Sequence, residues 1–228
     1  MKKADFARYF INKPCNDNFA GSDMCFFSGM KGGSAVFAAA HPTSDSRSGI
    51  ACEKIIRVMA DSFLGRPSLC DEAAETLADF ANKNVYALQE PYRTFLADAA
   101  VLFIHRGKAR FVLSGNSRVY YLSDGKSAVM SEAKDYMLFG KCARFKEYIP
   151  PEFPLSGNVN AFVIVCGTGN TVFDAKQLES SFEGVLCADE WAEKLSSLRS
   201  DDDRLSLMTV ILPKRKGIFA FFSKRGGE

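Results

Sequence analysis

The chain has 228 residues, of which 47% are hydrophobic and 25% charged, and its formal net charge is +2. This composition is typical of one globular domain with a sizeable core, and the small net charge supplies no basic field that would favour nucleic acid as a partner. The charged opening residues contain no apolar core of signal-peptide length, and no apolar run approaches the roughly 18 residues that a membrane span needs. We expect a cytoplasmic protein without a transmembrane segment.

Cysteine usage supports the same expectation. The chain has seven cysteines, and five of them fall at irregular spacing without any Cys-x-x-Cys pair: Cys15, Cys25, Cys52, Cys70 and Cys187. Such a set is typical of reduced, mostly buried thiols, and favours neither a disulfide framework nor a zinc site.

The first half of the chain predicts a strand followed by two helices. The apolar run Val36–Ala40 predicts the strand, after a Lys-Gly-Gly turn. A helix is expected to begin at Ser46 or Ser48 and to stop at the Gly-Arg-Pro of residues 65–67, and a second helix is expected over Asp71–Asn84. Their expected apolar faces are Ile50, Ile55, Met59 and Phe63 in the first helix and Ala74, Leu77, Ala78 and Ala81 in the second.

The second half predicts a block of strands, two helices and a last strand. The strands of the block, joined by short polar turns, are expected at Ala99–His105, Ala109–Ser114, Val119–Leu122 and Ala161–Cys166. Helices are expected at Ala175–Phe182 and Ala188–Leu198, and the last strand at Leu205–Leu212. This order predicts an α+β fold, a layered sandwich in which helix pairs cover sheets.

One turn in this block is the most informative motif of the chain. Gly115-Asn116-Ser117-Arg118 stands between two apolar strand-like runs, and Asp124-Gly125-Lys126 supplies a second hairpin signal directly afterwards. The turn resembles the Gly-Asp-Ser-Arg hairpin of the PPM-type (type 2C) metal-dependent protein serine/threonine phosphatases, with Asn116 where that family has Asp.

Four further motifs resemble that family in order and spacing. They are Lys13–Asn18, Ala38–His41 followed by Gly49–Ala51, Val163–Gly169, and Asp202–Leu205 running into an apolar strand. The resemblance covers almost the whole chain. It implies an α+β fold, a layered α-β-β-α sandwich of two mostly antiparallel sheets flanked by helix pairs. It also implies one phosphatase-2C-like domain over residues 1–213, followed by a basic and aromatic tail over 214–228.

The family is understood to use two Mn²⁺ or Mg²⁺ ions, bridged by aspartates at strand ends, to activate a water for attack on a phosphoester. Such hard cations need several anionic oxygen ligands, and two ions roughly 3.5–4 Å apart need carboxylates to offset their repulsion. The positions that the resemblance assigns to those aspartates hold other residues in this chain, namely Asn18, Ala40 with His41, Asn116 and Thr168. The resemblance therefore implies a degenerate metal site.

A few charged residues remain at or beside the family's positions. Asp202, Asp203 and Asp17 are candidates to hold one weakly bound Mg²⁺ or Mn²⁺, although residues 201–203 also suit a solvated acidic turn. Lys13 lies where the family has a basic residue that contacts substrate phosphate, and it equally suits a solvated surface position.

Other chemistry is less well supported by the residues. His41 has no second His or Cys at metal-ligand spacing, so a structural role is expected. Cys166 lacks the arginine of a Cys-x₅-Arg phosphatase loop, because Val172 stands there, and a core position is expected. The Gly-rich turn after Cys166 lacks the Lys-Ser/Thr of a P-loop, which favours a tight strand-to-helix turn.

We expect a catalytically inactive phosphatase-fold protein, a pseudophosphatase, that serves as a regulatory or partner-binding module. By analogy with the family its partner would be a kinase, a phosphoprotein or an active phosphatase. The alternative is a metal-dependent protein serine/threonine phosphatase with a rearranged, metal-poor active site built from Asp17, Asp45, Asp202 and Asp203. A third hypothesis is an oligomerisation or scaffold domain.

The C-terminal segment Lys214–Arg225 has basic clusters on both sides of an apolar aromatic patch. This pattern is typical of a short membrane-surface anchor, although the run is too short to span a membrane. A tail that packs on the domain and a docking segment for a partner are the alternatives.

Overall fold

We analysed a computed structural model of the whole chain, which describes residues 5–11, 26–43, 48–89, 95–132, 137–143, 148–156, 158–168, 173–198 and 204–212. Its strands are β1 (Asp5–Ile11), β2 (Phe26–Lys31), β3 (Ser34–Pro42), β4 (Ala97–His105), β5 (Lys108–Leu113), β6 (Arg118–Ser123), β7 (Lys126–Glu132), β8 (Phe153–Pro154), β9 (Asn160–Thr168) and β10 (Arg204–Leu212). Its helices are α1 (Ser48–Gly65), α2 (Asp71–Tyr86), α3 (Ala175–Phe182) and α4 (Ala188–Ser196).

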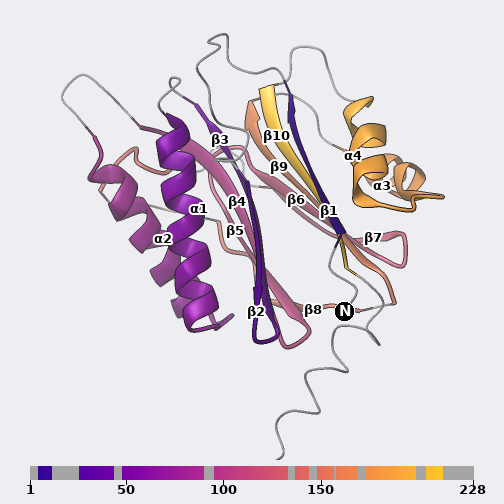
Figure 1. Cartoon of the computed structure of the whole chain (residues 1–228), viewed down its shortest axis with the longest axis horizontal. Coiled ribbons are helices and arrows are strands. Elements are labelled where there is room, and N and C mark those ends of the chain that lie inside the picture. Colours follow the sequence, from indigo (N-terminus) through magenta and orange to yellow (C-terminus); the bar gives the residue numbers. More distant parts are fainter. Residues whose placement is uncertain are drawn as a thin grey trace, which may run out of the picture.

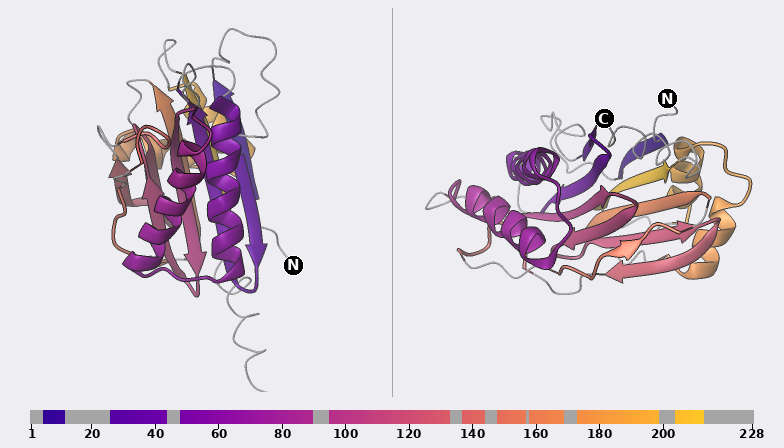
Figure 2. Two further views of the ribbon diagram at one scale, coloured as in Figure 1. Left: turned by 90° about the vertical axis from the view of Figure 1, so that its left-hand side faces the viewer. Right: turned by 90° about the horizontal axis from the view of Figure 1, so that it is seen from below.

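The strands form two five-stranded antiparallel sheets that stack face to face (Figure 1). One sheet has the order β1-β10-β9-β6-β7 and the other the order β2-β3-β4-β5-β8. Helices α1 and α2 cover the outer face of the second sheet, and α3 and α4 cover the outer face of the first, so that four layers result (Figure 2). The expected α-β-β-α sandwich is confirmed.

Strands at the centre of both sheets are buried on both faces. In β4 every residue from Ala97 to Ile104 is buried, which explains why Ala99–Ile104 is a continuous apolar run that does not alternate with polar residues. Aromatic rings fill the space between the sheets: the ring of Phe162 on β9 lies 6.3 Å from that of Phe111 on β5 and 5.0 Å from that of Tyr121 on β6. This central core sets the distance and orientation of the two sheets.

A second, smaller core joins α3 and α4 to the outer face of the first sheet. Trp191 of α4 is fully buried there, and its indole N–H donates to the hydroxyl of Ser181 on α3 at 3.0 Å. Asp174 caps α3 by accepting from the backbone N–H of Gln177, while the Gln177 side chain accepts from the backbone N–H of Asp174. This reciprocal capping box explains why α3 begins where it does.

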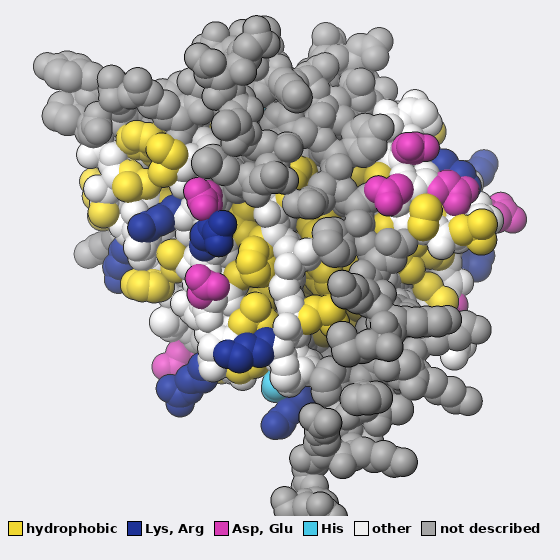
Figure 3. All heavy atoms as spheres, in the orientation of Figure 1, with side chains coloured by type: hydrophobic (Ala, Val, Ile, Leu, Met, Phe, Trp, Pro, Cys, Tyr) yellow, Lys and Arg dark blue, Asp and Glu magenta, His cyan; other side chains and the backbone are white. Residues whose placement is uncertain are grey.

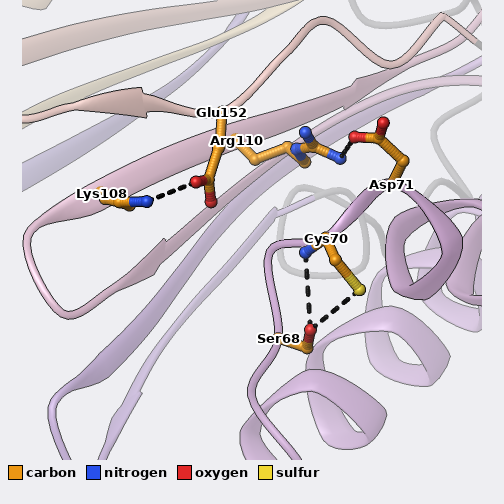
Figure 4. Close-up of polar contacts among 6 residues, drawn as sticks. All are labelled: Ser68, Cys70, Asp71, Lys108, Arg110 and Glu152. Carbon is orange, nitrogen blue, oxygen red and sulfur yellow. Dashed lines mark hydrogen bonds and ion pairs between the residues drawn. The ribbon is translucent and has the colours of Figure 1, made fainter.

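The outer face of the other sheet carries a buried charge. Arg110 of β5 is 3% exposed and its guanidinium reaches the carboxylate of Asp71, the first residue of α2, at 2.5 Å (Figure 4). Lys108, earlier on the same strand, pairs with Glu152 at 2.5 Å near the surface. The Arg110–Asp71 pair therefore links the helix layer to the sheet at the start of α2.

Most expected elements are found within a few residues, and some details differ. Ile50 was expected on the buried face of α1, but its side chain is 47% exposed. The buried positions of this face include Ala51, Cys52 and Ile55. Residues three or four positions before Ile55 share its face of the helix, whereas Ile50 stands five positions before it. The fourth helix ends at Ser196, before the expected Leu198.

No residue range was expected for strands β1, β2, β7 and β8, although the Asp124-Gly125-Lys126 hairpin signal falls at the β6–β7 turn. The run Phe-Phe-Ser-Gly-Met-Lys of β2 has Ser and Gly at its centre, and β2 and β7 are edge strands that pair on one side only. Edge strands bury less apolar surface, so their sequence pattern is weak. The expected boundary between residues 213 and 214 lies outside the described residues.

Candidate functional site at the strand ends

The strand ends named by the phosphatase-like motifs meet at one edge of the sandwich, at the top of Figure 1. In the second sheet, His41 at the end of β3 pairs with Asp98 near the start of β4. In the first sheet, Thr168 at the end of β9 pairs with Arg204 at the start of β10. The β5–β6 turn, which contains Asn116, connects the two sheets at the same edge. Motifs that are far apart in the sequence thus lie close together.

Ala40 and His41 face different layers of the sandwich. The Nδ1 atom of His41 lies 3.2 Å from the hydroxyl of Ser206 on β10, so this side chain points between the sheets and is buried. Side chains alternate along a strand, so Ala40 points the other way, to the face that packs against α1. Phe103 of β4 lies on that same face, where its ring contacts Phe63 of α1. At this position the residue that faces the inter-sheet space is His41.

One serine side chain of the β5–β6 turn binds β4, and a second closes the turn itself. The Ser114 hydroxyl accepts from the backbone N–H of Ala99 at 2.9 Å, and the Ser117 hydroxyl donates to the carbonyl of Ser114 at 2.6 Å. Gly115 has a positive φ of 60°, which glycine adopts without steric cost. Asn116, at the tip of this turn, is exposed.

Thr168 is the last residue of β9, and its side chain lies outside the described atoms. Two residues earlier, Cys166 is fully buried and its thiol donates to the carbonyl of Ala39 on β3 at 3.2 Å. The expectation that Cys166 is a core residue is confirmed.

Asp98 is a residue of this edge that the sequence motifs did not indicate. Its side chain points between the sheets beside His41, because paired residues of an antiparallel ladder share a face. It is 1% exposed, and neither carboxylate oxygen has a hydrogen-bond partner of normal geometry among the described residues. The sequence feature that could have indicated Asp98 is a single aspartate at the start of an otherwise apolar strand.

The surroundings of Asp98 disfavour its charged form. Burial raises the pKa of this carboxyl from 3.8 to about 7, although the backbone N–H groups of Asn116 and Gly167 and the charge of Arg118 act in the opposite direction. Arg118 itself is engaged with Glu132 on β7, at 2.9 Å. The Arg118 charge therefore compensates Asp98 only in part.

The remaining sequence candidates cannot be placed. Lys13, Asp17, Asn18, Asp202 and Asp203 lie outside the described residues, as does Asp45. Chain connectivity alone puts Asp203 directly before Arg204, the first residue of β10.

Within the described part of the chain, no three His, Cys, Asp or Glu side chains come together in a group that could hold a metal ion. The side chains at Ala40, His41 and Asn116 are a methyl group, an imidazole and an amide, and none is an anionic oxygen ligand of the kind that Mg²⁺ and Mn²⁺ require. These three side chains therefore supply no anionic oxygen to a two-metal centre.

A surface cavity of about 1000 Å³ lies away from this edge. The β6–β7 turn with Asp124 and Lys126, the neighbouring Asn158–Val159 segment, and α3 with Glu179 form its walls. The turn is at the far end of β6 from Arg118, so the cavity is separate from the strand-end site.

Comparison with protein-family models finds no match, and comparison with curated protein sequences finds none either. Solved structures, in contrast, are similar over nearly the whole chain. A serine/threonine phosphatase from S. agalactiae superposes with a TM-score of 0.70 at 8% identity, over 92% of this chain and 99% of that one. This similarity covers both sheets and their helix pairs.

Two further structures are similar to the chain. RsbX, solved in complex with magnesium, gives a TM-score of 0.63 at 15% identity over 94% of this chain and 97% of its own. A chain from a structure of the bacterial stressosome gives 0.62 at 14% identity over 92% and 100%. The chain therefore has the phosphatase 2C-like fold. At these identities the similarity establishes the fold, and the activity has to be argued from the residues.

Proposed function

We propose that this protein is a pseudophosphatase: a phosphatase-2C-like fold that has lost the metal-dependent chemistry and acts as a regulatory, partner-binding module. The observation that supports the proposal is the chemistry of the strand-end edge, where the family resemblance expects metal-binding carboxylates and this chain has His41 and Asn116. The Asp98 carboxylate, which is among the described residues of this edge, is buried, and its pKa is raised to about 7. A buried group that disfavours its anionic form is a poor ligand for a hard cation.

Partner binding is the activity that such a fold retains. The similar structures include a chain from the stressosome, a modular system adapted to control secondary messenger signalling. By analogy, a kinase, a phosphoprotein or an active phosphatase is the partner class that we propose. The described part of the face in Figure 3 has acidic and basic side chains intermixed over both helix layers. This mixture suits a protein partner better than a polyanion.

We propose a cytoplasmic location on the basis of the cysteine pattern. Among the described helices, none is both long and apolar enough to cross a bilayer. The thiols of Cys52 and Cys166 are fully buried, as is typical of cysteines in a reducing compartment.

Titration calorimetry with Mn²⁺ and Mg²⁺ on the purified full chain tests the loss of the metal site. We expect no binding heat at millimolar metal. Binding of two ions would contradict the proposal. A gain-of-function variant sharpens the test: His41→Asp combined with Asn116→Asp and Thr168→Asp returns carboxylates to the edge and is expected to create measurable Mn²⁺ binding.

Ala40→Asp is the matched control for this variant. Because the Ala40 side chain faces α1 and is fully buried, a carboxylate there cannot reach the inter-sheet space. We expect it to lower the stability of the fold without creating a metal site. Mn²⁺ binding by the Ala40→Asp variant alone would mean that the strand end is rearranged relative to the structure described above.

The competing function is phosphoester hydrolysis by a rearranged site built from Asp17, Asp45, Asp202 and Asp203. The cluster Asp201–Asp203 directly before β10 is the observation that favours it, with Lys13 as the candidate contact for substrate phosphate. Turnover of an aryl phosphate with Mn²⁺, in wild type and in Asp202→Ala, decides between the two functions. Equal, near-zero rates support the pseudophosphatase, whereas metal-dependent turnover lost in Asp202→Ala supports the enzyme.

A further inference from the structure

Asp98 at the strand-end edge is a buried carboxyl group, and its protonation state depends on the groups that surround it. Both oxygens of Asp98 are shielded from solvent and lack a hydrogen-bond partner of normal geometry among the described residues, and the nearby backbone N–H groups of Asn116 and Gly167 offset its burial only in part. Leaving an ionised carboxylate in that condition costs several kcal/mol, so proteins neutralise such a group with a proton, a paired cation or a metal ion. These three possibilities can be compared at Asp98.

Pairing with a protein cation is incomplete. Arg118 acts on Asp98 through its charge, but its guanidinium Nε donates to Glu132 at 2.9 Å. Arg118 and Glu132 are cross-strand partners on β6 and β7. Residues alternate along β6, and Tyr121 of this strand stacks on Phe162 between the sheets. The Arg118 side chain therefore leaves the opposite face, toward α3 and α4.

The other titratable side chains described near Asp98 have hydrogen-bond partners of their own. His41 on β3 is its direct neighbour, and the imidazole Nδ1 is already engaged with Ser206 of β10. Cys166 on β9 uses its thiol to donate to the backbone of Ala39. In the segment 137–143, which contacts the β5–β6 turn, Lys141 is exposed to solvent.

Packing leaves little room for a metal ion against the carboxylate. Gly115 lies so close to Asp98 that a Cβ atom at this glycine would overlap the Oδ1 atom, and the methyl of Leu138 lies 2.9 Å from the same point. Among the described residues no third acidic, His or Cys ligand joins Asp98 and His41. Space and ligand number both favour the smallest neutralising species, which is a proton.

We propose that Asp98 keeps its proton in the folded protein up to near-neutral pH, so that a neutral carboxylic acid fills the space between the sheet ends. This inference goes beyond the proposed function, because it concerns what holds the edge together and not whether the protein turns over a substrate. Loss of the proton creates a buried anion next to the β5–β6 turn and the end of β9. The edge is thereby sensitive to pH.

Proton linkage determines whether the stability of the fold rises or falls with pH. The unfolded chain releases the Asp98 proton near pH 3.8, whereas the folded chain retains it up to a pKa of about 7. Over this interval Asp98 binds more protons in the folded state than in the unfolded state, so its contribution to stability falls as the pH rises and becomes constant above about pH 7. Most surface carboxylates, which have lowered or ordinary pKa values, do not produce this trend.

Urea unfolding of the full chain in EDTA between pH 5 and pH 8.5 tests the proposal, with Asp98→Asn as the main variant. Asparagine has nearly the same shape but no proton to lose. We expect the unfolding constant of wild type, divided by that of Asp98→Asn, to increase at least about tenfold between pH 5 and pH 8. Asp61→Asn, at an exposed position of α1, should leave the ratio to wild type unchanged with pH.

Two results would overturn the proposal. One is a wild-type to Asp98→Asn ratio that does not change with pH. The other is stabilisation of wild type at pH 8 by Mg²⁺ or Mn²⁺ that is absent in Asp98→Asn, because Asp98 then holds a metal ion instead of a proton. If Asp98→Asn does not fold, carbon NMR of wild type with labelled Asp carboxyls decides. One carboxyl should titrate near neutral pH, and titration of every carboxyl below about pH 5.5 would refute the proposal.

Discussion

The Cα atom of Gly115 packs directly against the carboxylate of Asp98, and no side chain fits between them. Gly115 has a φ of 60° in the β5–β6 turn, while Asp98 belongs to β4 of the second sheet. The contact therefore fastens the turn that joins the two sheets onto the strand ends. Glycine is needed there both for the backbone conformation and for the close approach.

Replacement of Gly115 by alanine should be strongly destabilising. The new Cβ would overlap the Asp98 carboxylate and Leu138, and the alanine backbone would have an unfavourable positive φ. We therefore expect a loss of about 2–5 kcal/mol in the free energy of unfolding. Urea denaturation measures this loss. Gly32→Ala is the matched control, because Gly32 has a φ of 53° but open space around it, and should cost only about 1–2 kcal/mol. Equal costs at the two positions would show that the close contact is absent.

The Arg110–Asp71 pair should contribute more to stability than an ion pair that is fully exposed. Arg110 is 3% exposed and Asp71 is 83% exposed, so removal of the exposed partner leaves a buried charge with less compensation. We expect Asp71→Asn to lower the free energy of unfolding by about 1–3 kcal/mol.

Asp79→Asn provides the comparison for this pair. Asp79 pairs with Lys83 one turn later on the exposed side of α2, and loss of such a surface pair costs at most about 0.5 kcal/mol. Thermal and urea unfolding of both variants measure the difference. A cost for Asp71→Asn no larger than that for Asp79→Asn would mean that the buried guanidinium is neutralised by another group.

Cys70 should be the most reactive of the described thiols. It is exposed at the start of α2, where the hydroxyl of Ser68 lies 3.2 Å from its Sγ atom (Figure 4). That hydrogen bond and the backbone of Ala73 lower the pKa of the thiol, against a smaller opposing effect of Glu72. A larger thiolate fraction near neutral pH means faster alkylation.

Iodoacetamide labelling followed by peptide mapping measures this reactivity. We expect Cys70 to be modified well before the buried Cys52 and Cys166, with a pH midpoint below that of an ordinary thiol. Ser68→Ala should move the midpoint upward. Modification of all three cysteines at one rate would indicate that the native state opens before the thiols react, and would contradict the prediction.

The C-terminal segment Lys214–Arg225, which lies outside the described residues, carries a prediction from its sequence alone. If it contacts membrane surfaces, the full chain should bind anionic vesicles at low salt, and binding should fall as the salt concentration rises. Replacing Phe219, Phe221 and Phe222 by serine should abolish binding, because the aromatic patch supplies the apolar contact. Vesicle co-sedimentation measures both effects. No binding by wild type to anionic vesicles would exclude a membrane role for the segment.

Local sequence was sufficient for the elements that bury apolar surface on both sides or at a helical period. The continuous run of β4 and the Ile55–Phe63 spacing of α1 predict a strand and a helix whatever surrounds them, since hydrophobic periodicity is a local property. The Gly-Asn-Ser-Arg turn likewise predicts the β5–β6 connection, because positive φ at Gly115 is a local demand. Edge strands such as β2 have no such signal and form only because β3 offers hydrogen-bonding groups.

The sequence by itself determined the fold class and the order of its central elements. It also showed that the motifs at the strand ends contain His41 and Asn116, which are not carboxylates. Only the tertiary structure decided which of Ala40 and His41 faces the space between the sheets, because that choice depends on strand pairing and on the sheet stacked above. It also revealed Asp98. A lone aspartate becomes a buried acid only when residues from other parts of the chain, such as Gly115 of the β5–β6 turn, pack against it and exclude water.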